Sequence, residues 1–396
     1  MQEKYIDLLL QKCIDKNNPY LFINYDIQNE DFIDKLVIRA KELGIREIYL
    51  DKNDIYKEHE ILKSISYEQI ENHPYFNRSL WNEYAKKDCS FLLFRTLFPG
   101  VMDDIEPEKI ARAEYVKRNT SYFFRNKQLA YQVSWCMATL PSKLWAEKIF
   151  GKNDGSVDKL WDFIFKICMV DKENPEENWN EFISKNQMMI NKLNNLKLKY
   201  LHYKNKLGTD LRIELLEEVI WHDAFSRGIV NMPSYEIYTT PHYLKTNGLV
   251  YSSMPLHYNG ALIYEFFLEF KDGKVINYGA KKGEEVLKNI IYSDANSCYL
   301  GEVALVEDNS PNSNEKIATG VTLIDENASC HLALGKGFSN SIPNGNNMTA
   351  HELLENGINQ SPVHVDFMIG TSDLEITGET KDGQKIKILE KGNFII

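Results

Sequence analysis

The chain contains no apolar run of about 18 or more residues, the length that a membrane-spanning helix needs. Its first segment, MQEKYIDLLLQKCIDK, lacks a basic start followed by a continuous apolar core, so we expect no signal peptide. Only six of the 396 residues are cysteines, and none form a CxxC pair. A chain of this size needs no disulfide scaffold, and unpaired cysteines are natural in a reducing, cytoplasmic compartment.

The sequence also lacks an excess of basic residues. It has 46 Lys and Arg against 57 Asp and Glu, a formal net charge of −11. A nucleic-acid-binding protein needs a basic face, so we expect no nucleic-acid partner. No glycine-rich phosphate loop follows any predicted strand, which leaves a nucleotide site without support.

What is present indicates two domains. Up to about residue 110, apolar segments such as PYLFINY, REIYLD and CSFLLFRTL alternate with helical patterns, which is typical of a parallel or mixed sheet. Residues 105 to about 200 are largely helical, and the segment EPEKIARAEYVKRNTSYFFRNK predicts one long charged helix. We therefore predict an α/β N-terminal domain over residues 1–190, with a helical second half.

From about residue 200, short strands and turns replace the long helices. Lys271-Asp272-Gly273 predicts a hairpin turn, and Thr349 with Glu352 predicts a capping box at the start of a helix. The fold class predicted for residues 191–396 is therefore an α+β domain.

The segment HVDFMIG carries the first candidate site. In a strand, side chains alternate between two faces, so an imidazole and a carboxylate share one face and apolar residues share the other. The face with the imidazole and the carboxylate carries His364, Asp366 and Met368, and the apolar face carries Val365, Phe367 and Ile369. This pattern suits a metal site on a rigid wall, but it equally suits a half-buried strand with two surface polar residues.

The same pattern, a candidate metal ligand at a strand-like position, occurs in three further stretches: PSYEIYTTP, GEVALV and DENASCHLALG. They contribute Glu236, Glu302 and His331 at strand-like positions. Two imidazoles and three carboxylates exceed the roughly four ligands of a structural zinc site and fit two divalent cations about 3.5–4 Å apart. Two cations, three carboxylates and a bridging hydroxide would also leave the site neutral. Alternation turns the thiol of Cys330 away from His331, so we expect it to be a small buried residue.

The segments NMPSYE, LGEVALV, DENASCHLALG and NQSPVHVDFMIG resemble the signature segments of the thermophilic metalloaminopeptidases of the aminopeptidase T and aminopeptidase S type. The resemblance implies a cytoplasmic exopeptidase, commonly a homodimer, that removes N-terminal residues from peptides with a free N-terminus. It places the catalytic dinuclear site in residues 191–396. By motif, it implies the metal ligands Glu236, Glu302, His331, His364 and Asp366.

In the implied mechanism, a metal-bridged hydroxide attacks the first peptide carbonyl. Glu302 is the first choice for the carboxylate that carries the proton to the leaving amine. Zn²⁺, Co²⁺ and Mn²⁺ are the candidate ions, with Mg²⁺ as a further candidate.

One position departs from the family pattern. Phe338 stands where the family usually has a tyrosine, and phenylalanine cannot donate a hydrogen bond. A catalytically impaired homologue that binds metal or peptide therefore stays open as an alternative. Another two-metal hydrolase such as a phosphoesterase stays open as well, because it could use the same ligand types.

Residues around the motifs have two readings each. The pairs Asn327/Ser329 and Asn359/Ser361 could hydrogen-bond to the metal-binding histidines, or could serve turns. Asp325 and Glu326 are either further acceptors near the site or surface acids. We expect His222 to be structural, and His242 to lie near Glu236 without binding metal.

Overall fold

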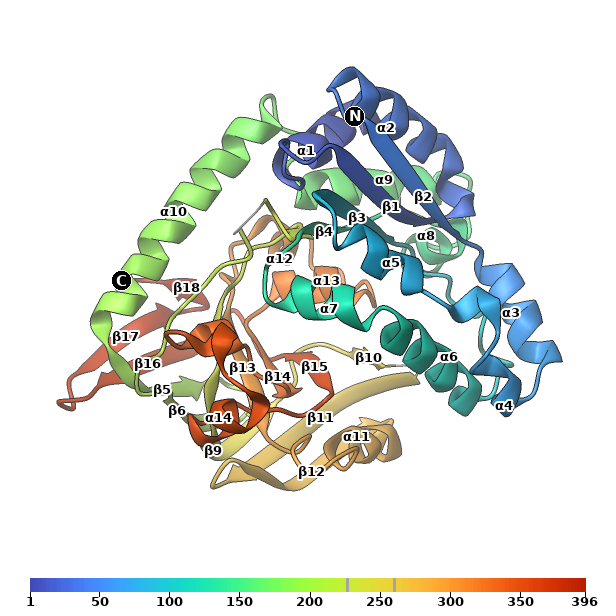
Figure 1. Cartoon of the computed structure of the whole chain (residues 1–396). Coiled ribbons are helices and arrows are strands. Elements are labelled where there is room, and N and C mark those ends of the chain that lie inside the picture. The colour runs from blue at the N-terminus through green and yellow to red at the C-terminus, as the bar shows by residue number, and fades with distance from the viewer. Residues whose placement is uncertain (226–227, 259–260) are drawn as a thin grey trace. The chain divides into compact units, whose positions relative to one another are not determined.

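The computed structural model describes residues 1–225, 228–258 and 261–396, which form two compact units (Figure 1). Unit 1 comprises Met1–Asn180 and Phe225–Ser234, and unit 2 comprises Glu181–Ala224 and Tyr235–Ile396. The predicted boundary between residues 190 and 191 falls inside helix α10 (Pro175–Leu196). Among the described residues, no helix combines the length and the apolar character that crossing a membrane requires.

Unit 1 is built on a five-stranded parallel sheet in the order β2-β1-β3-β4-β7, which agrees with the predicted α/β pattern. Its strands are β1 (Tyr20–Asp26), β2 (Glu47–Asn53), β3 (Cys89–Arg95), β4 (Ser134–Thr139) and β7 (Asn231–Met232). Its helices are α1 (Gln2–Lys12), α2 (Glu30–Glu42), α3 (Ile55–Ser64), α4 (Tyr67–Ile70), α5 (Ser79–Tyr84), α6 (Pro107–Thr120), α7 (Tyr122–Leu129), α8 (Lys143–Phe150) and α9 (Ser156–Ile167).

Helices cover both faces of this sheet. Phe91 and Phe94 lie three residues apart on β3, so their side chains point to opposite faces. Phe91 packs on Phe124 of α7, with ring centroids 4.5 Å apart, whereas Phe94 packs on Phe32 of α2 at 6.0 Å. Buried strands between two helical layers explain their nearly continuous apolar sequences.

The prediction of one long helix over residues 106–127 was wrong, because α6 and α7 are separated at Ser121. The hydroxyls of Thr120 and Ser121 donate to the carbonyls of Val116 and Lys117, each four residues earlier. Such hydroxyl contacts compete with the helical backbone pattern and account for the break.

Unit 2 contains a nine-stranded antiparallel sheet in the order β10-β11-β9-β6-β5-β16-β17-β18, with β12 paired to β11. The predicted hairpin joins β11 and β12, and Asp272 and Gly273 both have positive φ, as a two-residue hairpin turn requires. The strands are β5 (Leu198–Lys204), β6 (Asp210–Leu215), β9 (Pro241–Tyr251), β10 (Leu256–Tyr258), β11 (Ala261–Lys271), β12 (Lys274–Lys282), β16 (Glu375–Thr380), β17 (Lys385–Glu390) and β18 (Asn393–Phe394).

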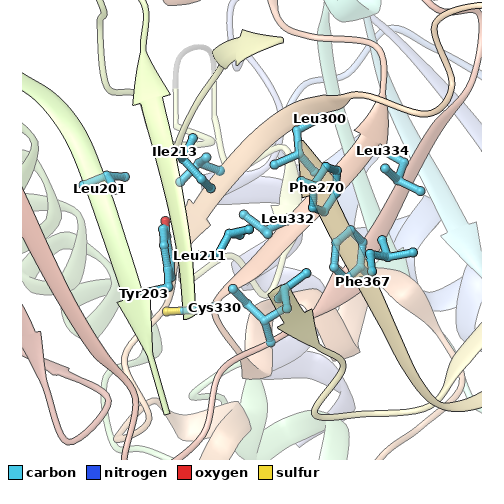
Figure 2. Packing of buried hydrophobic residues seen from close by; sticks show 14 of the residues in the cluster. Leu201, Tyr203, Leu211, Ile213, Phe270, Leu300, Cys330, Leu332, Leu334 and Phe367 are labelled. Carbon is cyan, nitrogen blue, oxygen red and sulfur yellow. The ribbon is translucent and has the colours of Figure 1, made fainter. Parts of the chain in front are cut away.

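A second, four-stranded antiparallel sheet in the order β15-β14-β13-β8 packs against the large one, and is called the small sheet below. Its strands are β8 (Ile237–Thr239), β13 (Leu300–Leu305), β14 (His331–Gly335) and β15 (His364–Met368). Figure 2 shows the shared core, in which Leu211 of the large sheet lies close to Leu332 of the small sheet. Because one face of the small sheet is buried in this core, its polar residues gather on the other face.

Short helices complete unit 2. They are α11 (Glu284–Ile291), α12 (Pro311–Asn314), α13 (Thr322–Asp325) and α14 (Ala350–Glu355). The predicted capping box is present at α14, where the Thr349 hydroxyl accepts from the Glu352 N–H and the Glu352 carboxylate accepts from the Thr349 N–H.

Candidate metal centre

The polar face of the small sheet carries predicted site residues in adjacent rows, where a row is a set of residues paired across neighbouring strands. In the strand register, Glu302 lies opposite Ala333, which lies opposite Asp366. His331 lies opposite Ala304, in the next row. The two alanine side chains are small, so they leave space between the polar groups.

Glu302 reaches this face because of a bulge. The register of β13 shifts between Leu300 and Glu302, so Leu300 faces the core although it is only two residues from Glu302. A Cβ atom at Gly301 would lie 2.3 Å from the carbonyl oxygens of both Gly335 and Lys336. Glycine is therefore required where the strand reverses the direction of its side chains.

The five predicted donors are brought together. His331 Nε2 lies 3.2 Å from Glu236 Oε2, and His364 Nε2 lies 3.0 Å from both Glu302 Oε2 and Asp366 Oδ1. Two groups emerge in which the donor atoms all lie within 4.8 Å of one another. The first is Glu236, Glu302 and His331, and the second is Glu302, His364 and Asp366. Glu302 belongs to both.

The chemistry of these groups fits divalent cations. Imidazole nitrogens and carboxylate oxygens are common ligands of Zn²⁺ and Mn²⁺. Asp366 Oδ1 is buried and accepts no hydrogen bond of good geometry from the described residues, although His364 Nε2 is close to it. A buried carboxylate oxygen in this state is costly unless a cation or another donor reaches it.

Burial and mutual charge shift the pKa values of the site. Burial raises the pKa of Glu302 to about 7, against the effect of the hydrogen bond from His364. Burial disfavours the charged form of His331, but hydrogen bonding to Glu236 and the charge of Glu302 outweigh it and raise its pKa to about 10. Burial would raise the pKa of Asp366, yet the positive charge of His364 lowers it to about 2. Without a metal, protons on the imidazoles balance the acids.

The second ring nitrogen of each histidine reaches a main-chain carbonyl. His331 Nδ1 is 3.1 Å from the carbonyl oxygen of Ser329, and His364 Nδ1 is 2.8 Å from that of Lys336. These contacts orient Nε2 toward the carboxylates. Sequence reasoning missed both acceptors, because a backbone carbonyl leaves no signal in the choice of residue.

The hypothesis that Asn and Ser side chains bond to the two histidines is not supported. Asn359 donates to the carbonyls of Asn296 and Tyr299, and the Ser361 hydroxyl donates to Asp294. These contacts hold turns, which was the alternative reading.

The first Asn/Ser pair has a different role. Strand-like alternation of side chains does not extend from His331 back to Asn327, because residues Glu326–Ala328 form a 3₁₀ helix. Asn327 Oδ1 instead accepts the N–H of Tyr235 at 2.6 Å. It thereby fixes the backbone immediately before Glu236.

The two acids before His331 differ from each other. Asp325 accepts the N–H groups of Thr319 and Gly320, so it is a buried structural group. Burial and the negative charges of Asp366 and Glu236 raise the pKa of Glu326 well above its ordinary value. Glu326 therefore lies within the electrostatic influence of the donor groups.

Three other candidates fall outside the donor groups found among the described residues. His222 Nε2 contacts the Asn340 carbonyl at 2.7 Å and its backbone pairs with Tyr238, so it is structural as expected. His242 Nδ1 accepts the N–H of Leu244. Cys330 faces the core and burial raises the pKa of its thiol to about 12, which does not favour a thiolate ligand.

Phe338 lies against the site. Its ring centroid is 5.3 Å from that of His364 and 4.8 Å from that of Tyr238. The ring therefore spans from the second donor group toward β8, without offering a hydrogen-bond donor.

Comparison with known proteins agrees with this geometry. A family model described as thermophilic metalloprotease (M29) matches residues 1–394. Aminopeptidase 2 of Geobacillus stearothermophilus is 34% identical, with 99% of this chain and 97% of the relative covered. Aminopeptidase PepS of Streptococcus thermophilus is 33% identical, with 100% and 98% covered. The solved structure of wild-type AmpT from Thermus thermophilus superposes with a TM-score of 0.90 at 25% identity, with 100% and 99% covered.

Proposed function

Since the chain belongs to the thermophilic metalloprotease (M29) family, we propose that it is a metal-dependent aminopeptidase that hydrolyses the N-terminal peptide bond of peptides. The observation that carries the proposal is the position of Glu302, which is shared by two donor groups on one face of the small sheet. One carboxylate between two groups suits a pair of divalent cations about 3.5–4 Å apart.

Each donor group would hold one ion. Glu236 and His331 would hold the first and His364 and Asp366 the second, and Glu302 lies within reach of both. Zn²⁺, Co²⁺ and Mn²⁺ are the ions that this donor set suits, with Mg²⁺ as a further candidate. When bound, such ions polarise the peptide carbonyl and lower the pKa of water toward neutrality.

Glu302 is the group proposed to move the proton. It would accept a proton from the attacking water and deliver it to the nitrogen of the departing amine. Its rigid attachment to the bulged strand β13 keeps the carboxylate in place between the donor groups.

The proposed substrates are peptides with a free N-terminus, because a metal ion held by these donors would supply a ligand position for the lone pair of a free α-amine, which an acetylated amine could not fill. We also propose a homodimer, which sedimentation velocity would test. The cysteines of the described residues are free and buried, which favours the proposed cytoplasmic location.

A metal-dependence assay on matched peptides tests this function. Chelation of the protein should abolish hydrolysis of leucyl dipeptides, and Co²⁺, Zn²⁺ or Mn²⁺ should restore it. The N-acetylated forms of the same dipeptides should remain uncut. Hydrolysis that persists in metal-free protein, or that is equal for blocked and unblocked peptides, would contradict the proposal.

Neither alternative is favoured. The named relatives are aminopeptidases, which does not support a phosphoesterase. A protein with full metal content that turns over no peptide would be identified as an impaired homologue. Hydrolysis of phosphomonoesters would identify a phosphoesterase.

A further inference from the structure

We propose that Arg95, Arg118 and Arg125 form a binding site for a dianionic phosphate group in unit 1. All three arginines belong to unit 1, whereas the candidate metal ligands belong to unit 2. The inference does not rest on the peptidase reaction, so either proposal can fail without the other.

The position of Arg95 in the sheet of unit 1 is the first support. Arg95 is the last residue of β3, at the carboxyl end of a parallel sheet. The strand order β2-β1-β3-β4-β7 changes direction between β1 and β3, because the chain places β2 on one side of β1 and β3 on the other. In open parallel sheets, ligands bind outside the carboxyl ends of the strands at such a point. Arg95 therefore stands where a ligand of unit 1 is expected.

The second support is that two helices bring further guanidinium groups close to Arg95. Strand side chains alternate, so Arg95 shares a face of β3 with Phe91, which packs on Phe124 of α7. Arg125 follows Phe124 in the first turn of α7, and Arg118 lies in the last turn of α6. Burial lowers the pKa of Arg125, and the positive charges of Arg118 and Arg95 lower it further. The three guanidinium groups are therefore near neighbours.

The third support is that the charge of these groups is not neutralised within the described residues. There, none of the three guanidinium groups makes a hydrogen bond or an ion pair. Glu114 acts on Arg95, but its carboxylate lies 2.9 Å from Lys117 Nζ, which also contacts Glu58 at 2.7 Å. Lys117 and its two acids have a net charge of −1, so the three arginines leave the cluster with a net charge of +2.

A phosphate group has the charge and the shape that suit this cluster. It carries about −1.5 to −2 at neutral pH, whereas a carboxylate carries a single charge and would leave the cluster positive. A guanidinium group can bind two oxygens of a phosphate through parallel hydrogen bonds. Arg95 and Arg118 are exposed and Arg125 is half-buried, so a ligand can reach them from solvent. Free phosphate and the phosphoryl group of a larger ligand share this chemistry.

Calorimetry of the full chain with inorganic phosphate tests the inference. In a chloride buffer of constant ionic strength, phosphate should bind saturably and acetate should not. Arg118→Gln and Arg125→Gln should each weaken phosphate binding by about tenfold, the usual effect of losing a hydrogen bond to a charged group. Arg118→Lys should have an intermediate affinity, because an ammonium group keeps the charge but loses the paired hydrogen bonds.

Arg39→Gln is the matched control, because it removes the same charge from unit 1. Arg39 on α2 is already paired, with Asp7 at 2.6 Å and with Glu42 at 2.9 Å. Its replacement should leave the phosphate affinity within about twofold of wild type, since salt screens charges at a distance. Titrations with and without added metal separate this site from phosphate bound to metal ions, because the effect of the arginine variants should be the same in both.

A titration with N-acetyl phosphoserine amide distinguishes the two sources of the phosphate group. Tighter binding than that of inorganic phosphate would support a phosphorylated ligand, and equal or weaker binding would support the free ion. The absence of saturable phosphate binding to wild type would overturn the inference. Equal phosphate affinities in wild type and in Arg118→Gln would also overturn it, and this exposed position decides the test if Arg125→Gln does not fold.

Discussion

At the scale of single residues, the most specific prediction concerns the effect of replacing Glu302 on metal content and hydrolysis. Glu302→Gln removes the charge shared by both donor groups, so metal content per chain should fall and hydrolysis should drop by about 10²–10⁴-fold. Metal analysis and steady-state kinetics measure the two effects. Glu285→Gln, at a side chain that is 81% exposed on α11, should change neither. An active, fully loaded Glu302→Gln protein would exclude the proposed role.

The pKa shifts predict that metal uptake releases protons. The pKa of His331 is raised to about 10 and that of His364 is raised well above its ordinary value, so both rings are protonated at pH 7 without metal. A coordinating imidazole must be neutral, so metal affinity should fall as the pH falls, by up to about tenfold per pH unit for each proton displaced. Calorimetry in buffers of different ionisation enthalpy counts these protons. A pH-independent affinity between pH 6 and 8 would contradict the assigned donors.

The clustering of the five candidate donors could be predicted because each stands out within an apolar run, whereas their binding of metal stays a prediction. Glu236, Glu302 and Asp366 are acids in strand-like segments, and the structure brings all three near the two histidines. Their supporting contacts were not predictable, since the acceptors are carbonyls of Ser329 and Lys336. Which backbone atom faces a ring depends on strand pairing, not on the local sequence.

At the scale of elements, strand alternation separates stability from metal binding. Leu332 lies in the core, next to His331 on the other face of β14. Leu332→Ala should lower the free energy of unfolding by about 3 kcal/mol, as for other buried leucines, while folded protein keeps its metal affinity. Chemical denaturation and metal titration measure the two quantities. Leu244→Ala, at a residue that is 43% exposed, should lower the free energy of unfolding by less than about 0.5 kcal/mol.

A substitution in the bulge of β13 is instead expected to change the metal affinity. In Gly301→Ala, the new methyl group would meet two carbonyl oxygens at 2.3 Å and force the backbone to move. Because this backbone aims Glu302, metal affinity should fall by about 10–100-fold, the effect seen when groups that orient ligands are changed. Gly155→Ala is the control, since its Cβ would meet only a 3.7 Å contact. Equal metal affinities in the two variants would show that the bulge does not position Glu302.

The elements themselves were only partly predictable. Hairpin and capping signals at Asp272-Gly273 and Thr349 depend on neighbouring residues, so the sequence revealed them. The face of Glu302 and the break at Ser121 depend on particular backbone contacts. A pattern of apolar residues cannot show where a strand gains a bulge.

At the scale of the whole molecule, metal and folding are linked. Ions that bind only the folded protein stabilise it by about 2.7 kcal/mol at 100 times their Kd. Chelation should therefore lower the melting temperature, and added Zn²⁺ or Mn²⁺ should raise it again. Glu302→Gln should show a smaller shift than wild type. An identical melting temperature with and without metal would contradict a site on the small sheet of unit 2 that binds ions only in the folded protein.

The chain-level organisation was the hardest to predict. A boundary near residue 190 was predicted from the change along the sequence from long helices to short strands and turns. The domain limits themselves stay a prediction. The segment 225–234 belongs with unit 1 although unit 2 residues precede and follow it. Its short strand β7 pairs with β4, nearly one hundred residues earlier in the chain, and no local pattern encodes such a return.

The order of the strands along the chain has a consequence for synthesis. The donors of the first group lie on or next to β8, β13 and β14, whereas His364 and Asp366 arrive with β15. Translation runs from the N-terminus, so a nascent chain that has not yet emerged beyond β15 lacks two of the three residues of its second donor group. Loading of the complete centre must therefore wait until β15 has left the ribosome and paired with β14.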